Sequence, residues 1–233
     1  MRILAVGAHP DDIEILCAGT LLRYRRLGHD VIMAIATNGD QGHISIMPKE
    51  LAVIRQKEAE QSAAILGAEL IWMGYHDQFM NPDESTRLAF VEMVRKAAPD
   101  IVITHDPQDY ARDHRIVSEL MFAATFMASV PHLETGSAPT KKVPPLYYMD
   151  SVGGSNFLPT EYVDISAEMK DKLAMLNCHQ SQLTWLKEHV NVDIMDLIET
   201  VAKFRGLACG VPHAEGFRHL DAWGRTPVGN LLP

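Results

Sequence analysis

The chain alternates short apolar runs with longer segments in which apolar residues recur every three or four positions. The short runs have the continuity of strands that are buried on both faces of a parallel sheet. The longer segments have the periodicity of amphipathic helices, and glycine or proline ends several of them. The predicted strands are Ile3–Ala8, Val31–Ala36, Leu70–Met73 and Ile101–Thr104, and the predicted helices are Ile15–Leu27, about Lys49–Leu66, Thr86–Ala97 and Ile116–Ser129.

This order of elements predicts an α/β fold with a Rossmann-like doubly wound, mostly parallel sheet and helices on both faces. Beyond about Thr135 the pattern is less regular. We expect strands at Leu146–Val152 and Tyr162–Ile165 and helices at Glu168–Cys178 and Asn191–Arg205. Because no change of composition marks a boundary, we expect a single domain over residues 1–233, with the sheet core in 1–135 and the remainder, 136–233, completing the pocket.

The composition supports this fold and narrows the choice of partners. The chain has 233 residues, of which 47% are hydrophobic, so it can bury a substantial core. Its formal charge of -9 argues against a nucleic-acid partner. The three cysteines form no CxxC pair, which favours a reducing compartment, and no apolar run is long enough for a signal sequence or a membrane span. We therefore expect a cytoplasmic protein.

Potential metal ligands follow the first predicted strand directly, in the sequence His9-Pro10-Asp11-Asp12. An imidazole and a carboxylate three residues apart can face one point at the edge of the sheet, and both are suitable ligands for zinc. The intervening Asp11 would stay free to act as general base on a metal-bound water. The alternative is an Asx-turn that only caps the following helix.

A second cluster, Asp109–Arg115, follows the predicted strand Ile101–Thr104 at the same sheet edge. In this cluster His114 could supply a third metal ligand, and Asp113 could orient a histidine or share in proton transfer. The alternative is a solvated charge run at the start of a helix, where aspartate is favoured. Two clusters of acidic residues and histidine after two buried strands favour the metal site.

Several blocks of the sequence also match a known family pattern in the same order along the chain. They are Ala5–Leu21, Thr37–Gly42, Arg55 with Lys57–Ala59 and Leu66–Gly67, His105–Pro107, Asp109–Tyr110, Asp113–Arg115, His179–Gln182 and Ala214–Phe217. In these blocks the chain resembles the PIG-L/LmbE-like zinc-dependent de-N-acetylases. The first block is the most specific of them.

The resemblance implies a set of roles and a reaction. His9, Asp12 and His114 would be the zinc ligands, Asp11 the general base and Arg55 a substrate-binding residue. The cofactor would be Zn²⁺, with another divalent metal such as Fe²⁺ as the alternative. The implied reaction removes an N-acetyl group from an N-acetylglucosamine-type sugar or its conjugate, so the partner would be a small amino-sugar or amide. Family members are often homo-oligomers, so the resemblance also makes a homo-oligomer plausible here.

For Arg55 the alternative to substrate binding is a surface residue of the helix that pairs with Glu58.

Two departures from the family pattern affect the predicted site. The second family motif usually reads His-Pro-Asp-His, whereas this chain has Ala111-Arg112-Asp113-His114, so His105, Arg112 or another group would have to replace the missing histidine. In relatives a tyrosine often precedes Ala-Glu-Gly-Phe, and this chain has His213 there. We therefore count Asp113 and His213 with Asp11 as candidate catalytic residues, and Arg112 with Arg55 as candidate substrate-binding residues.

These departures leave two alternatives to the de-N-acetylase. One is a related amidase or deacylase that acts on a non-acetyl amide conjugate. The other is a catalytically weakened homologue that binds metal. A nucleotide-dependent oxidoreductase is excluded, because carboxylates occupy the turn where a glycine-rich loop would bind pyrophosphate.

Overall fold

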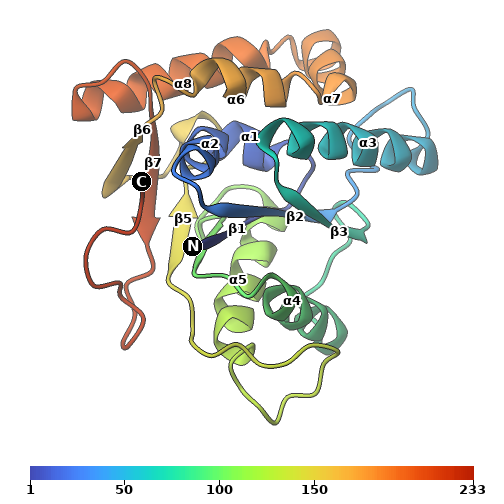
Figure 1. Ribbon diagram of the computed structural model, residues 1–233. Coiled ribbons are helices and arrows are strands. Elements are labelled where there is room, and N and C mark those ends of the chain that lie inside the picture. Colours follow the sequence, from blue (N-terminus) through green and yellow to red (C-terminus); the bar gives the residue numbers. More distant parts are fainter.

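The computed structural model describes residues 1–233, and it contains one seven-stranded sheet in the order β3-β2-β1-β4-β5-β7-β6 (Figure 1). The strands from β3 to β5 pair in parallel, whereas β7 is antiparallel to both of its neighbours. The prediction of a mostly parallel α/β sheet is thus confirmed. The strands are β1 (Arg2–Gly7), β2 (Asp30–Thr37), β3 (Glu69–Tyr75), β4 (Ile101–Thr104), β5 (Leu146–Met149), β6 (Glu161–Asp164) and β7 (Ala214–His219).

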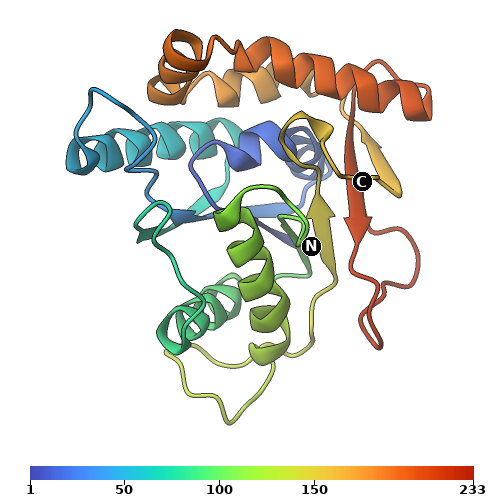
Figure 2. The same ribbon diagram turned by 180° about the vertical axis from the view of Figure 1, so that it is seen from behind.

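Helices cover both faces of the sheet, and each face has its own cluster of buried apolar side chains (Figures 1 and 2). The helices are α1 (Asp12–Leu16), α2 (Ala18–Arg26), α3 (Pro48–Leu66), α4 (Glu84–Ala97), α5 (Arg112–Met127), α6 (Met169–Leu176), α7 (Gln180–Trp185) and α8 (Ile194–Cys209), with a 3₁₀ turn η1 (Val152–Gly154) and a π-helical turn η2 (Leu186–Val190). None of them combines the length and the apolar character that crossing a bilayer requires.

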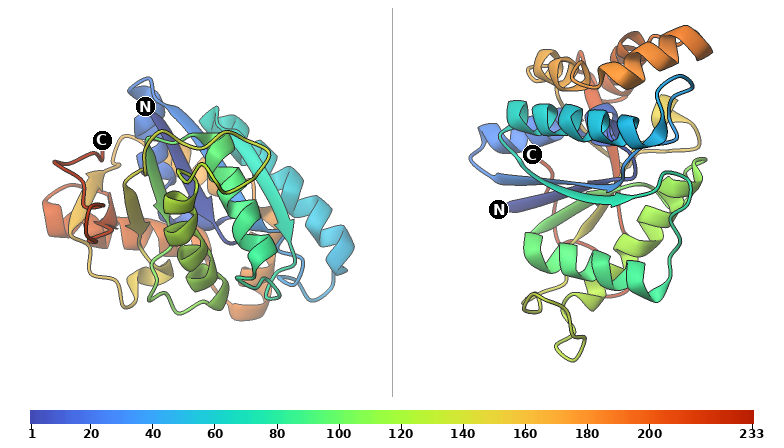
Figure 3. Two further views of the ribbon diagram at one scale, coloured as in Figure 1. Left: turned by 90° about the horizontal axis from the view of Figure 1, so that it is seen from below. Right: turned by 90° about the vertical axis from the view of Figure 1, so that its right-hand side faces the viewer.

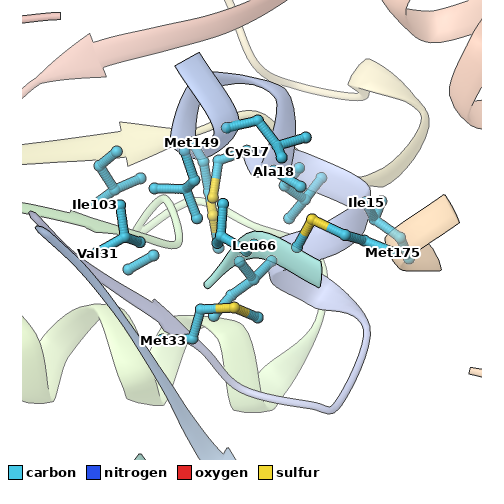
Figure 4. Packing of buried hydrophobic residues seen from close by; sticks show 14 of the residues in the cluster. Ile15, Cys17, Ala18, Val31, Met33, Leu66, Ile103, Met149 and Met175 are labelled. Atoms are coloured by element: carbon cyan, nitrogen blue, oxygen red, sulfur yellow. The ribbon is translucent and has the colours of Figure 1, made fainter. Parts of the chain in front are cut away.

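The helices α6, α7 and α8 form a further layer outside α1, α2 and α3, while α4 and α5 cover the opposite face (Figures 1 and 3). The larger apolar cluster fills the space between the sheet and these upper layers. There the thiol of Cys17 is buried with Met33, Leu66 and Met149 (Figure 4). The C-terminal part of the chain therefore covers the N-terminal helices rather than forming a sheet of its own.

The predicted helix Ile15–Leu27 is in fact two helices. The backbone of Cys17, at φ -146°, separates α1 from α2, and α1 already begins at Asp12. Likewise α5 begins at Arg112 rather than at Ile116, because Ala111 is extended and ends the preceding loop. Both corrections move candidate site residues into the first turn of a helix, where the backbone fixes their direction.

The apolar pattern of the sequence does not predict strand β7, because polar residues interrupt that pattern. Its Glu215 is buried, and the carboxylate accepts hydrogen bonds from the backbone N–H groups of Gly19 and Thr20 at 2.9 and 2.8 Å. The ammonium of Lys172 lies 2.5 Å from the same carboxylate. This buried ion pair joins β7 to α2 and α6, which the hydrophobic pattern alone does not reveal.

The strand order has a reversal point at β1, which lies between β2 and β4. Chain segments leave the carboxyl ends of β1 and β4 in opposite directions there, so a crevice opens between them. The predicted His9–Asp12 turn follows β1, and the second predicted cluster follows β4. The fold therefore brings the two clusters together.

Candidate metal centre and active site

The turn between β1 and α1 is held by its own side chains. The backbone N–H of His9 donates to Asp12 Oδ2 at 2.7 Å, and Asp11 is the residue that precedes the helix. The φ of Asp11 is +116°, a backbone conformation that residues other than glycine rarely adopt. The surroundings therefore hold Asp11 in a strained position, which is typical of functional sites.

The three predicted ligands converge. One ligand atom from each of His9, Asp12 and His114 can be chosen so that all lie within 4.8 Å of one another. The Asp12 carboxylate lies 3.4 Å from His9 Nδ1 and 3.3 Å from His114 Nε2. Ligands of one tetrahedral zinc ion lie about 3.4 Å apart, given metal–ligand distances near 2.1 Å. The donor set and its spacing therefore fit a zinc-type ion.

The second ring nitrogen of each histidine faces a carboxylate. His114 Nδ1 lies 3.0 Å from Asp109 Oδ2, and His9 Nε2 lies 3.2 Å from Asp77 Oδ1 and 3.5 Å from Asp113 Oδ2. Carboxylates in such positions fix the ring orientation and raise the basicity of the ligating nitrogen. The arrangement leaves His9 Nδ1 and His114 Nε2 as the atoms that could hold a metal.

The neighbouring charges of this cluster shift the pKa values of its members. Burial opposes ionisation of Asp12, but the neighbouring His114, His105 and His9 together hold its pKa well below the usual range. Burial also disfavours protonation of His114, yet the Asp12 and Asp109 carboxylates raise its pKa to about 9. The cluster is thus an anionic pocket that holds protons in the absence of metal, and a bound cation would displace them.

Asp11 lies beside this cluster without belonging to the donor set. It is 5% exposed, and burial raises its pKa to about 6 although the Arg55 guanidinium, 3.6 Å away, opposes the rise. A carboxylate with a raised pKa can both accept and return a proton near neutral pH. This is the protonation behaviour that the predicted general base requires.

Arg55 joins the loops that follow β1 and β2. Its guanidinium donates to the backbone carbonyl of Pro10 at 2.7 Å and to that of Gly39 at 3.0 Å, and the side chain is buried. It does not pair with Glu58, whose carboxylate instead accepts from Ser181. The buried Nε of Arg55 has no hydrogen-bond partner.

Gly39 is needed for this contact. Its φ is +64°, and a Cβ at this position would lie 2.4 Å from Arg55 Nη1. Any larger residue would therefore push the guanidinium away from the turn that contains Asp11. The Thr37–Gly42 block of the sequence thus supports the site through the backbone.

A cavity of about 500 Å³ opens over the candidate metal centre. Its polar side includes His9, Asp11, Asp12, His114 and Arg55, so the donor set and the candidate base lie at one wall. Other lining residues come from the segment that contains α7, η2 and the first turn of α8. Substrate entering this cavity would meet the metal centre and Asp11 together.

The missing histidine at position 111 is not replaced directly. Ala111 lines the cavity with its small side chain. His105 is fully buried, stacks on the His114 ring with 3.9 Å between centroids, and lies 3.1 Å from Asp12 Oδ2. Burial and the charge of His114 lower its pKa to about 4. His105 therefore supports the ligands and does not line the cavity.

Two other predicted residues lie outside the cavity wall. Arg112 donates to the carbonyls of Gln78 and Met80 and to the Asn81 side chain, so it holds the loop after β3. His213 follows the far end of α8, whereas the start of that helix lines the cavity. The sixteen residues of α8 separate the two ends by about 24 Å. The structure does not bring His213 together with the other candidates.

Sequence reasoning missed Asp77 and did not recognise the position of Asp109 beside His114. Asp77 follows β3 at the same sheet edge as the other clusters, and its backbone N–H donates to Asp40 at 3.1 Å. A polar residue directly after a third strand is the signal that could have identified it. Gln182 and Trp185 also line the cavity, and each has a buried polar atom without a partner.

Two deacetylases are among the characterised proteins to which the chain is similar. The chain is 29% identical over 228 residues to diacetylchitobiose deacetylase of Thermococcus kodakarensis, and this match covers 93% of this chain and 82% of the relative. The structure of N,N'-diacetylchitobiose deacetylase from Pyrococcus horikoshii superposes with a TM-score of 0.81 at 28% identity, over 94% of this chain and 83% of that one.

The fold also occurs with another chemistry. The structure of 4-carboxy-2-hydroxymuconate hydratase from Pseudomonas putida superposes with a TM-score of 0.83 over 99% of this chain and all of that one, but at 21% identity this shows the fold alone. A family model described as PIG-L, GlcNAc-PI de-N-acetylase, matches residues 4–125, just over half of the chain. The chain therefore belongs to the PIG-L family.

Proposed function

We propose that this protein is a zinc-dependent hydrolase that removes an N-acetyl group from an N-acetylglucosamine-type amino sugar or its conjugate. The observation that carries the proposal is the position of Asp11, buried beside the His9, Asp12 and His114 donor set at the wall of a 500 Å³ cavity. The named deacetylase relatives support the proposal, one through sequence similarity and the solved structure also through its fold. A metal-dependent hydrolase that cleaves an unactivated amide needs its metal site and a proton-transfer group within reach of the same amide.

The residues of the site have three roles in this proposal: metal binding, proton transfer and orientation of the histidines. His9, Asp12 and His114 would hold the metal, which when bound supplies a more acidic water and polarises the amide carbonyl. Asp11 accepts a proton from the attacking water and returns it to the leaving nitrogen. Asp113 and Asp77 orient His9, and Asp109 orients His114.

Arg55 has a positioning role and a binding role. Its hydrogen bonds to the Pro10 and Gly39 carbonyls hold the turn of Asp11, while its unpartnered Nε is available to a substrate oxygen. Arg112 and His213 have no contact with the substrate in this mechanism, because neither lines the cavity.

The experiment combines metal analysis with an acetate-release assay on N-acetylglucosaminides. The purified protein should hold about one zinc per chain, and His9→Ala should lose it. Asp11→Asn should keep the metal and lose turnover by at least about 100-fold. Asp30→Asn, which changes an exposed carboxylate far from the cavity, is the matched control. Full turnover by Asp11→Asn would remove Asp11 as the base, and absence of acetate release from all sugars would refute the proposed reaction.

A second candidate function is a deacylase or amidase for larger amide conjugates. It is favoured by Ala111, because the small side chain enlarges the cavity next to His114. A panel that compares acetyl with larger acyl groups on the same sugar separates the two candidates.

A further inference from the structure

One part of the wall of the cavity is apolar. It consists of side chains from one stretch of the chain together with Val152, and the members from that stretch are Trp185, Leu186, Val190, Val192, Ile194 and Leu197. No charged residue of this stretch lines the cavity. Lys187 and Glu188 line a separate neighbouring hollow of about 340 Å³ instead. The cavity therefore has one charged side and one apolar side.

The apolar wall is held in place from behind. Leu186, Leu197 and Val152 pack with part of their surface against the large buried cluster. Val190, by contrast, is 53% exposed although it is apolar. Because the core holds this wall in place and part of its apolar surface is exposed, an apolar group that covers the wall makes the free energy of binding more favourable.

The wall suits an apolar group better than a further sugar ring. From Gln182 to Leu197, the lining residues have two side-chain polar atoms that are buried without a hydrogen-bond partner, Gln182 Oε1 and Trp185 Nε1. They offer one acceptor and one donor. A sugar ring has several hydroxyl groups, and most of them would lose their hydrogen bonds to water against this surface without replacement.

We propose that the wall from Trp185 to Leu197 is a subsite for an apolar substituent of the substrate. The substituent would be either an apolar group linked to the anomeric carbon of the sugar or an N-acyl chain longer than acetyl. This inference rests on the proposed function, since it assumes that the amide lies at the metal centre. It assigns substrate selectivity to a part of the chain that carries no metal ligand.

Equilibrium binding to the full-length, zinc-loaded Asp11→Asn variant tests the subsite without turnover. Three ligands are compared by calorimetry: methyl N-acetylglucosaminide as reference, phenyl N-acetylglucosaminide, and methyl N-hexanoylglucosaminide. At least one apolar ligand should bind about 10-fold more tightly than the reference, and the one that does so identifies the substituent. Introducing Val190→Asp into the Asp11→Asn variant should remove most of this difference in affinity between the apolar ligand and the reference. Leu207→Asp is the matched control, because Leu207 is 81% exposed on α8 and lies outside the cavity.

The outcomes separate the subsite from the proposed reaction. Equal affinity for all three ligands would overturn the subsite, and so would a ratio that Val190→Asp leaves unchanged. Failure of the wild-type enzyme to release acetate, with the affinity ratio and its loss in Val190→Asp intact, would overturn only the proposed reaction. Loss of the ratio in Leu207→Asp as well would show a general effect of the new charge, and would also count against the subsite.

Discussion

Replacing Asp11 by asparagine should stabilise the metal-free protein at pH 8 while it removes the proposed base. Burial raises the pKa of Asp11 from its ordinary value of 3.8 to about 6, against the opposing charge of Arg55. Below about pH 4 the carboxyl is protonated in both the folded and the unfolded chain. Between pH 4 and 6 the unfolded chain releases the proton that the folded chain still holds, so stability falls as the pH rises.

Above about pH 6 both states are ionised and the loss is complete. A shift of two pKa units corresponds to about 3 kcal/mol of unfolding free energy. Asparagine does not titrate, and it tolerates positive φ better than most residues, so it should escape this loss without new backbone strain. The difference in stability between Asp11→Asn and wild type should therefore rise by up to about 3 kcal/mol between pH 4 and pH 8.

Urea denaturation of chelator-treated protein at several pH values measures this difference. Asp30→Asn serves as control for the removal of an exposed carboxylate outside the cavity. A difference for Asp11→Asn that does not change between pH 4 and pH 8 would refute the reasoning. So would a variant that is less stable than wild type at pH 8.

Three further predictions concern the supports of the site and of the sheet. Gly39→Ala should lower the free energy of unfolding by about 1–3 kcal/mol and also lower turnover, because the new Cβ would meet the guanidinium of Arg55 beside Asp11. Gly28→Ala is the control: Gly28 has a φ of +81° and no atom within 4 Å of an added Cβ, so this variant should lose stability alone. Asp109→Asn should weaken zinc binding by about 10- to 100-fold in a competition assay with a chromophoric chelator, and unchanged affinity would remove Asp109 as an orienting group. Lys172→Met should lower the free energy of unfolding by about 3–5 kcal/mol, because it leaves the buried carboxylate of Glu215 unpaired. Lys203→Met breaks an exposed pair and should leave the midpoint of urea denaturation unchanged.

The sheet and the convergence of the two clusters could be predicted because both follow from local patterns. Continuous apolar runs gave the strands, and the rule that ligands bind at the carboxyl ends of parallel strands placed His9, Asp12 and His114 at one edge. The PIG-L resemblance is confirmed by the family match over residues 4–125.

The features that the sequence does not predict depend on contacts between distant segments of the chain. Glu215 reads as a surface residue in the sequence, but hydrogen bonds from α2 and the charge of Lys172 make its burial favourable. The same holds for Asp77, whose position beside His9 depends on Asp40 in another loop. Local patterns also did not identify α7 and η2 as separate elements, although these form much of the apolar wall.

The cavity is built from two parts of the chain that can vary separately. Every proposed ligand, the base and Arg55 lie within residues 4–125, whereas the apolar wall lies between Trp185 and Leu197, with Val152 beside it. Substitutions in the later segment can therefore change which amide is accepted without disturbing the machinery that cleaves it. For protein engineering, this makes the short span from α7 to the start of α8 the place to diversify when a new substrate is wanted, with the hydrolytic centre left as it stands.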